Sequence, residues 1–252
     1  MRKAIFKADL KPRLEKLFAN WKPGEVPAKN IGAVVPKAKV EVYLLDRPGA
    51  LQSVIFAGNI APPKGNPDEI AIQTMNTVLG GEFTSRVNMN LREDKHWSYG
   101  AATFIPSARG PRPFIGYAPV QTDKTKESMV ELDKELRGIL GKIPISAEEL
   151  SKAQQTLTLQ LPGRWETSGA VEGSISEIVR FGLADDYYRT FPKKVRALTV
   201  ADLNLAASIV VQPDRIVWIV VGDRAKIEAG IRELNWGEIH FLDADGQPLA
   251  SR

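Results

Sequence analysis

The chain has 252 residues, of which 43% are hydrophobic and 25% are charged, so it is too apolar to be disordered and is large enough for one sizeable domain or two small ones. Its net charge is +4, but lysine and arginine are scattered among 30 acidic residues without a basic block, which argues against a nucleic-acid-binding module. The absence of cysteine excludes disulfides, thiolate metal sites and a cysteine nucleophile.

The start of the chain shows no targeting or membrane signal. Residues 1–20, MRKAIFKADLKPRLEKLFAN, carry charges throughout and lack the apolar core of a signal peptide. No apolar run in the chain approaches the length of a membrane span. We therefore predict no signal peptide in this chain and no membrane insertion. The compartment stays open, because the chain can be a piece of a longer precursor.

The first third of the chain predicts a helix, a connection and a hairpin. Asp9 is expected to cap a helix whose apolar residues recur at helical spacing as far as Trp21. Three prolines in residues 21–39 predict an extended surface connection. The runs VEVYLLD and LQSVIFAG then flank Pro48-Gly49, a pair that suits the centre of a type II turn, so we expect a hairpin.

The middle of the chain predicts a helix followed by a second hairpin. The segment PDEIAIQTMNTVLGG places Ile72, Met75 and Leu79 on one face and ends in a glycine pair, which is a good helix stop. The apolar runs WSYGAATFI and PFIGYAPVQ flank PSARGPR, so these two segments are expected to pair as antiparallel strands.

The second half is richer in helices. Apolar residues at helical spacing predict helices at 125–141 and around Val171. Ser146 with Glu149, and Thr199 with Asp202, are capping-box patterns that mark two more helix starts. The run RIVWIVVGD is a buried strand that leads into a helix, and EIHFLD is a short last strand. Hairpins mixed with blocks of helices predict an α+β fold with a mostly antiparallel sheet packed against helices.

The residues offer no complete hydrolytic site. His96 and His240 lie 144 residues apart, whereas H-E-x-x-H and H-x-x-E-H zinc motifs need two histidines four apart on one helix. Glu93 and His96 form only half of a carboxylate–histidine metal site. We expect His96 to be a surface or core-edge residue, and we expect this chain to bind no metal or other cofactor. There is also no G-x-S-x-G elbow and no P-loop.

One segment, LGGEFTSRVNMNLREDKHWSYGA, is familiar. A glycine pair at 80–81, a Ser-Arg at 85–86, Leu91-Arg92 and Tyr99-Gly100 occur in that order. This pattern resembles the signature of the C-terminal, non-zinc half of pitrilysin-type (insulinase) zinc peptidases, the family that includes mitochondrial processing peptidase. The resemblance extends to LEKLFANWKPG and VYLLDRPGALQSVIFAGN, and so to nearly the whole chain. It therefore implies a single domain of this type over 1–252.

The resemblance implies that the zinc site lies in another half of the enzyme. Enzymes of this family are built from two homologous halves that close like a clamshell, and the zinc with its H-x-x-E-H motif lies in the N-terminal half. The resemblance therefore implies a zinc-bearing homologous partner half, in the same precursor or as a separate subunit, and an unfolded peptide as substrate. The chain by itself is expected to be inactive. Bacterial relatives suggest the periplasm or cell envelope.

The resemblance also assigns two site residues. Arg92 is implied to bind substrate, and Tyr99 to bind substrate and to polarise the scissile carbonyl in catalysis with the partner half. From the residues alone another interpretation is open, in which Arg92 ends a solvated helix paired to Glu93 or Asp94 and Tyr99 is a half-buried strand residue. An alternative function is a non-catalytic scaffold or interaction domain of the same family.

Overall fold

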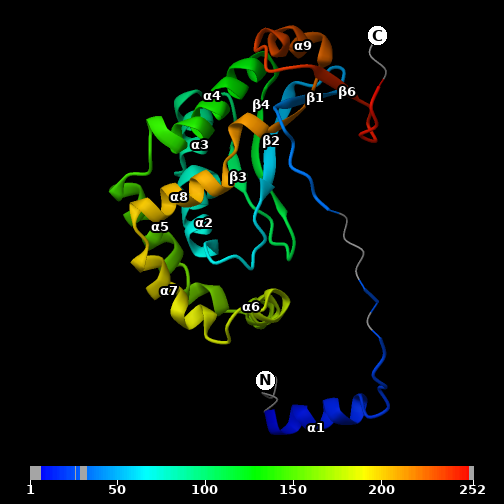
Figure 1. Ribbon diagram of the computed structural model, residues 1–252, viewed down its shortest axis with the longest axis vertical. Coiled ribbons are helices and arrows are strands. Elements are labelled where there is room, and N and C mark those ends of the chain that lie inside the picture. The colour runs from blue at the N-terminus through cyan, green and yellow to red at the C-terminus, as the bar shows by residue number, and fades with distance from the viewer. Residues whose placement is uncertain (1–6, 26, 29–32, 250–252) are drawn as a thin grey trace. The chain divides into compact units, whose positions relative to one another are not determined.

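The computed structural model describes residues 7–25, 27–28 and 33–249, and the chain divides into two compact units, Met1–Val34 and Val35–Arg252. The first unit contains helix α1, Lys7–Leu17 (Figure 1). Asp9 lies within the first turn of this helix and does not cap it. The described part of 21–39 forms no helix or strand, as predicted, while residues 26 and 29–32 of this connection lie outside the described residues.

The second unit is built on a six-stranded sheet with the order β3-β4-β2-β5-β1-β6. Its strands are β1 Glu41–Asp46, β2 Gln52–Ala61, β3 Ala102–Phe104, β4 Arg112–Gln121, β5 Val217–Gly222 and β6 Ile239–Leu242. Strands β3, β4, β2 and β5 pair antiparallel in succession, whereas β1 is parallel to both β5 and β6. The α+β class is confirmed, and the sheet is mixed, since the two pairings of β1 are parallel.

The first predicted hairpin is wrong, although its turn is right. Gly49 has φ +76° and the amide of Ala50 bonds to the carbonyl of Arg47 at 3.1 Å, as in a type II turn at Pro48-Gly49. Strands β1 and β2 are nevertheless not neighbours, because β5 lies between them and pairs with both. The turn reverses the chain direction but does not make β1 and β2 pair with each other. A strand from far along the sequence, β5, can therefore lie between them.

The second hairpin, β3 with β4, is confirmed but is shorter than the sequence predicts. Ser98 makes an isolated bridge to Val120, and regular pairing resumes only at Ala102. Two side chains explain the gap. The amide of Gly100 donates to Ser98 Oγ at 3.1 Å, and the amide of Ala101 donates to Asn88 Oδ1 at 3.1 Å. These two backbone donors are therefore occupied by side-chain acceptors.

Eight helices follow in the second unit among the described residues. Their bounds are α2 Glu69–Asn76, α3 Arg86–Asn88, α4 Thr125–Arg137, α5 Ala147–Leu159, α6 Ser168–Phe181, α7 Tyr187–Ala197, α8 Val200–Val210 and α9 Arg224–Glu233. Three of them continue as π-helical turns, α2 over Thr77–Gly81, α3 over Met89–Asp94 and α4 over Gly138–Lys142. Within the described part of the chain, no single helix is long and apolar enough to cross a membrane.

Local sequence signals account for some of the helix starts. Both predicted capping boxes form, at Ser146 on α5 and at Thr199 on α8. Helix α7 was not predicted from the sequence. Its buried residues Tyr187, Phe191 and Val195 do recur at helical spacing, but Pro192 interrupts the pattern.

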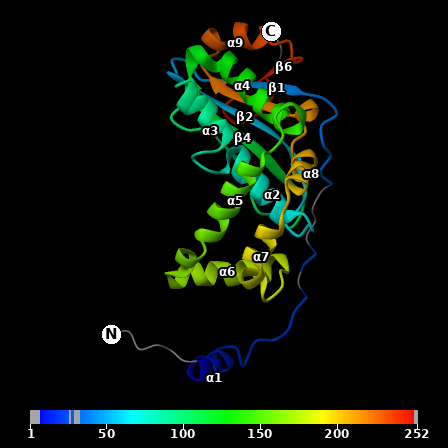
Figure 2. The same cartoon turned by 90° about the vertical axis from the view of Figure 1, so that its left-hand side faces the viewer.

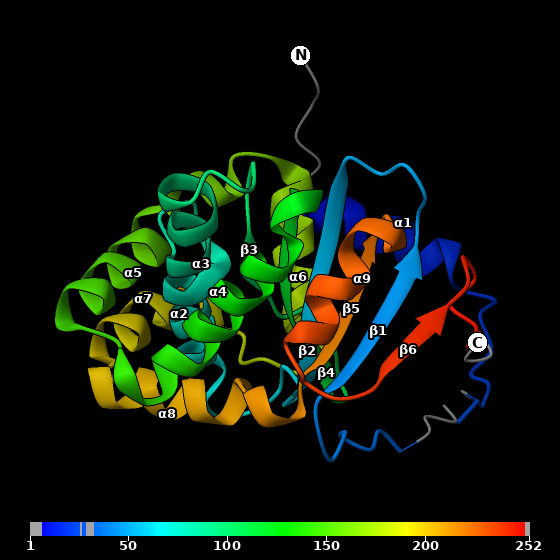
Figure 3. The same cartoon turned by 90° about the horizontal axis from the view of Figure 1, so that it is seen from above.

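The helices of the second unit lie on one side of its sheet. Figures 1, 2 and 3 show α2, α4, α8 and α9 over one face, while α5, α6 and α7 form an arm beyond it. Alternate residues of the strands, such as Leu44, Ile55, Phe114 and Trp218, are fully buried between sheet and helices. The α2 residues predicted to share a face are buried in the same core.

Gly80 is where the signature segment passes closest to the sheet. A Cβ atom at Gly80 would lie 2.3 Å from the backbone nitrogen of Thr103 in β3. Such a contact cannot be relieved by a flexible side chain, so one of the two backbones would have to move. A glycine is therefore needed at this position for packing, which refines the expected role of the pair as a helix stop.

We predict that Gly80→Ala lowers the free energy of unfolding by about 2–3 kcal/mol, in the range typical of overpacked cores. Gly173→Ala is the matched control, because Gly173 lies inside the exposed helix α6 and has open space around its Cα. There alanine is expected to be neutral or to stabilise by about 0.5–1 kcal/mol. Urea unfolding of both variants tests this, and equal effects of the two substitutions would contradict it.

Candidate functional site

The candidate site is the segment from Gly80 to Gly100, which connects the end of α2 to β3. Its helical part begins at Arg86 and ends at Asp94, so Arg92 stands in the last turn. Tyr99 follows on a bend between the Ser98 bridge and β3, not on the strand itself as the sequence suggested. Arg92 and Tyr99 thus lie on either side of a short loop.

The side chain of Arg92 is held by contacts that leave part of its guanidinium accessible. The group lies over the ring of Phe83, 4.5 Å from the ring centre. Its Nε is 3.3 Å from a carboxylate oxygen of Glu93, and the Arg92 side chain is 39% exposed. An exposed pair of this kind contributes at most about 1 kcal/mol. Arg92 therefore pairs with Glu93, as the alternative interpretation suggested, yet remains open to another ligand.

Tyr99 is the most exposed aromatic side chain of the segment. It is 86% exposed, and its hydroxyl makes no hydrogen bond to any residue that the structure describes. The interpretation of Tyr99 as a half-buried strand residue is therefore wrong. A phenol hydroxyl in this state is a neutral donor available to a molecule that approaches from outside.

Asn88 links the two sides of the loop, and sequence reasoning missed it. This buried side chain donates to the carbonyl of Phe83 at 2.6 Å and accepts from the amide of Ala101 at 3.1 Å. Phe83 is the ring on which Arg92 lies, and Ala101 is two residues after Tyr99. Asn88 therefore fixes the backbone on both sides of the pair. A polar residue between the buried Val87 and Leu91 was the available signal.

Arg86 has a structural role. Its Nε and Nη2 contact both carboxylate oxygens of Glu149 at 2.6 and 2.7 Å, and its guanidinium also donates to the carbonyls of Ile143 and Pro144 at 2.5 and 3.0 Å. The side chain is only 11% exposed. Burial by itself would raise the pKa of Glu149, but the hydrogen bonds from Arg86 hold this pKa below its usual value.

His96 ends the helix that carries Arg92. It adopts φ +58°, in the left-handed region that often follows a helix, and its exposed ring places Nδ1 3.1 Å from the carbonyl oxygen of Arg92. Trp97 packs against the core next to it. Over the described ranges, no group of three or more histidine, aspartate or glutamate side chains could hold a metal ion.

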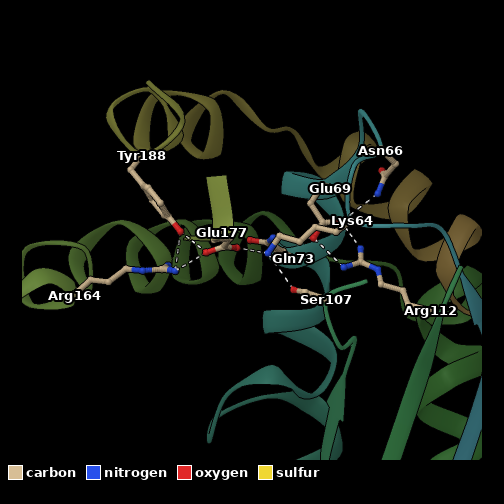
Figure 4. Close-up of polar contacts among 9 residues, drawn as sticks. All are labelled: Lys64, Asn66, Glu69, Gln73, Ser107, Arg112, Arg164, Glu177 and Tyr188. Carbon is tan, nitrogen blue, oxygen red and sulfur yellow. Dashed lines mark hydrogen bonds and ion pairs between the residues drawn. The ribbon is translucent and has the colours of Figure 1, made fainter. Parts of the chain in front are cut away.

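A second cluster of charges was not foreseen from the sequence. Arg112 at the start of β4 and Glu69 at the start of α2 form a buried ion pair with two contacts. Near it, Glu177 of α6 accepts hydrogen bonds from Lys64, Arg164 and Tyr188 (Figure 4). The residues of this cluster are separated by more than a hundred positions in the sequence, so no local sequence pattern predicts it.

The protonation states in this cluster follow from burial and charge together. Burial would raise the pKa of Glu177, but hydrogen bonds from Lys64 and Tyr188 hold it below the usual value, so Glu177 is an anion at neutral pH. Burial, with the charges of Glu177 and Glu69, raises the pKa of Tyr187 above its usual value, so this phenol stays neutral.

Comparisons with known proteins identify the domain type. A family model described as "Peptidase M16 inactive domain" matches residues 7–157. The structure is similar to the peptidase M16 inactive domain from Pseudomonas fluorescens, with a TM-score of 0.77 and 18% identity over 86% of this chain and 51% of that chain. This chain thus spans about half the length of that relative.

Two further solved structures share the fold. A putative zinc protease from Bordetella pertussis has a TM-score of 0.56 and 20% identity, over 67% of this chain and 93% of that chain. A chain of complex III from Candida albicans has a TM-score of 0.70 and 17% identity, over 91% of this chain and 56% of that chain. Identities this low establish the fold alone. The search of curated proteins found no match.

We predict that the two arginines of the segment differ in their effect on stability. Arg86→Met is expected to lower the free energy of unfolding by about 2–3 kcal/mol, because it leaves Glu149 and two carbonyls without their partner. Arg92→Met should change it by less than about 0.5 kcal/mol, as is usual for a surface side chain. Chemical denaturation of both variants decides the point, and a comparable loss in Arg92→Met would show that Arg92 is structural.

The contribution of the Arg86–Glu149 pair should depend on pH. Because the folded pKa of Glu149 lies below its usual value of 4.5, the stabilisation is fully present above pH 4.5 and is lost as the pH falls through the folded pKa. The stability difference between wild type and Arg86→Met should therefore shrink below pH 4.5. The difference for Arg92→Met serves as the control and should stay small throughout. A constant difference for Arg86→Met down to acid pH would contradict the pairing.

Proposed function

This chain belongs to the M16 peptidase family, whose inactive domain its sequence matches, and from this premise we propose that it is the substrate-binding half of a clamshell zinc metallopeptidase. A homologous partner half, in the same precursor or as a separate subunit, would carry the zinc and supply the metal-activated water. This chain would supply Arg92 and Tyr99 to the same chamber, and an unfolded peptide would bind between the halves.

The observation that carries the proposal is a contrast within one segment. The polar side chains of Arg86, Asn88 and Ser98 are engaged in hydrogen bonds that hold the fold. By contrast, Tyr99 is exposed, and Arg92 is partly exposed with only a weak surface pair to Glu93. The rigid surroundings thus present two side chains that the folded domain itself does not need, which favours a role in binding.

The chemistry of Tyr99 suits a peptide at the moment of cleavage. Attack on a peptide bond builds negative charge on the carbonyl oxygen, and a neutral hydroxyl can donate a hydrogen bond to that oxygen. Loss of one such donor typically costs about 2.7–4 kcal/mol in the transition state. Tyr99 would supply this donor from the side opposite the partner half.

The chemistry of Arg92 suits substrate positioning. Its guanidinium is always charged and offers a planar set of donors to backbone carbonyls of an extended peptide. The ring of Phe83 beneath it restrains the plane of the group, so less side-chain freedom is lost when the peptide binds.

The sheet supports the expectation of a partner half. The face opposite the helices is apolar, with half-buried Phe56, Ile115 and Ile219 on adjacent strands, and none of residues 35–249 places a helix on it (Figure 1). An apolar hollow of about 370 Å³ lies on this face. A homologous half would remove such a surface from water.

We predict that the chain alone cleaves no peptide, and that activity on an unstructured peptide appears when it is combined with the half that carries H-x-x-E-H. In the combined enzyme, Arg92→Ala and Tyr99→Phe should each lower kcat/KM at least tenfold, which corresponds to about 1.4 kcal/mol. Arg189→Ala is the control, because Arg189 is an exposed arginine on α7 away from the segment.

Two other outcomes would be decisive. Full activity in both variants would show that Arg92 and Tyr99 have no role in the site, although the two halves still form an active enzyme. Assembly with the partner half without any peptide cleavage would instead favour the scaffold role, as a non-catalytic domain of the same family.

A further inference from the structure

A charged cavity of about 310 Å³ lies between the β2–α2 loop, the start of β4 and the helical arm. Lys64, Glu69, Arg112, Arg164, Glu177 and Tyr187 are among the residues that line it. This volume is at the lower end of small-molecule sites, enough for a small acid or one long side chain. The cavity is distinct from the surface formed by Arg92, Phe83 and Tyr99, none of which lines it.

The carboxylates in the cavity walls are already bound by cationic and phenolic donors. Both oxygens of Glu69 are bound by Arg112, and both oxygens of Glu177 are bound by Lys64, Arg164 and Tyr188. Figure 4 shows Glu177 between Lys64 on one side and Arg164 with Tyr188 on the other. Each carboxylate oxygen of the cluster therefore already has at least one donor.

Several donors remain unused. Arg164 donates only through Nη2, so its Nε and Nη1 have no partner in the described part of the chain. Lys64 uses two of its three N–H groups, for Glu177 and Ser107. The hydroxyl of Tyr187 has no hydrogen-bond partner within the described residues, although the side chain is nine-tenths buried.

The net charge of the cavity walls also favours an anionic ligand. The walls carry three cations, Lys64, Arg112 and Arg164, against the two carboxylates of Glu69 and Glu177. One positive charge is therefore left over. Arg164 has a 45% exposed side chain, so its charge is also the one that a molecule from solution can reach.

We propose that this cavity is a binding site for a carboxylate group, which Arg164 and Lys64 hold with their unused donors and which Tyr187 contacts through its hydroxyl. Nη1 of Arg164 and the third N–H of Lys64 can each donate a charge-assisted hydrogen bond to one oxygen of a carboxylate. The carboxylate can come from an acidic side chain or from the free C-terminus of a peptide. The site does not depend on the role of Arg92 and Tyr99, because it uses different residues.

Binding can be measured on the full chain by NMR or calorimetric titration at constant ionic strength. N-acetylglycine presents a terminal carboxylate, and N-acetylglutamate amide presents only a side-chain carboxylate. N-acetylglutamine amide is the neutral control. We expect saturable binding of at least one acid and none of the neutral amide, and the stronger of the two acids identifies the source of the carboxylate.

Variants locate the binding in the cavity. Arg164→Gln should weaken the acid at least tenfold, while Arg189→Gln, a change at an exposed arginine on the adjacent helix, should leave affinity unchanged. Tyr187→Phe keeps the buried ring, removes only the hydroxyl and should weaken binding severalfold. Thermal melts establish that each variant is folded.

The proposal fails if neither acid saturates, if the neutral amide binds equally well, or if Arg164→Gln binds like wild type. In those cases the charges serve only to hold α6 against the body of the domain.

Discussion

Strand β5 lies between β1 and β2, and it is the strand that joins the two parts of the sheet. On one side it completes the antiparallel run β3-β4-β2, and on the other it supports the parallel strands β1 and β6. Its residues Trp218 and Val220 are fully buried under the helices. The family match ends at residue 157, well before β5, so the matched region alone lacks a central strand of its own sheet. The folding unit must therefore extend beyond that region.

The backbone of the signature segment is held in place by contacts with strand β3, with the loop before it and with helix α5. Gly80 allows the backbone to approach Thr103, Asn88 ties Phe83 to Ala101, and Arg86 anchors the start of α5 through Glu149. Loss of the Asn88 or Arg86 side chain would leave buried polar groups without a partner. A side chain at Gly80 would instead collide with the backbone of Thr103. Arg92 and Tyr99 make no such contribution. A rigid frame that presents an exposed Tyr99 and a partly exposed Arg92 is an arrangement that suits a binding surface.

The charged cavity shows a different use of polar groups. Buried ion pairs such as Arg112 with Glu69 add little net stability, because the desolvation of two charges offsets most of their attraction. Glu177 nevertheless collects three donors from three elements, and α6 is otherwise nearly all exposed. The hydrogen bonds of the cluster thus fix the orientation of the helical arm while adding little net stability. Lys64 and Arg164, which bind Glu177, also line the cavity, and each keeps N–H groups without a partner among the described residues.

The sequence by itself determined what depends on neighbouring residues. The capping boxes at Ser146 and Thr199, the type II turn at Pro48-Gly49 and the order of the signature could be predicted, because each needs only a few consecutive residues. Tertiary structure decided the rest. Strand β5 lies between β1 and β2, which were expected to form a hairpin, and Tyr99 lies before β3 instead of within it. The contacts of Asn88 and of Glu177 join residues that are far apart in the sequence. A turn fixes the direction of a chain but not the strand that pairs beside it, and a buried hydrogen bond depends on a partner that local sequence does not specify.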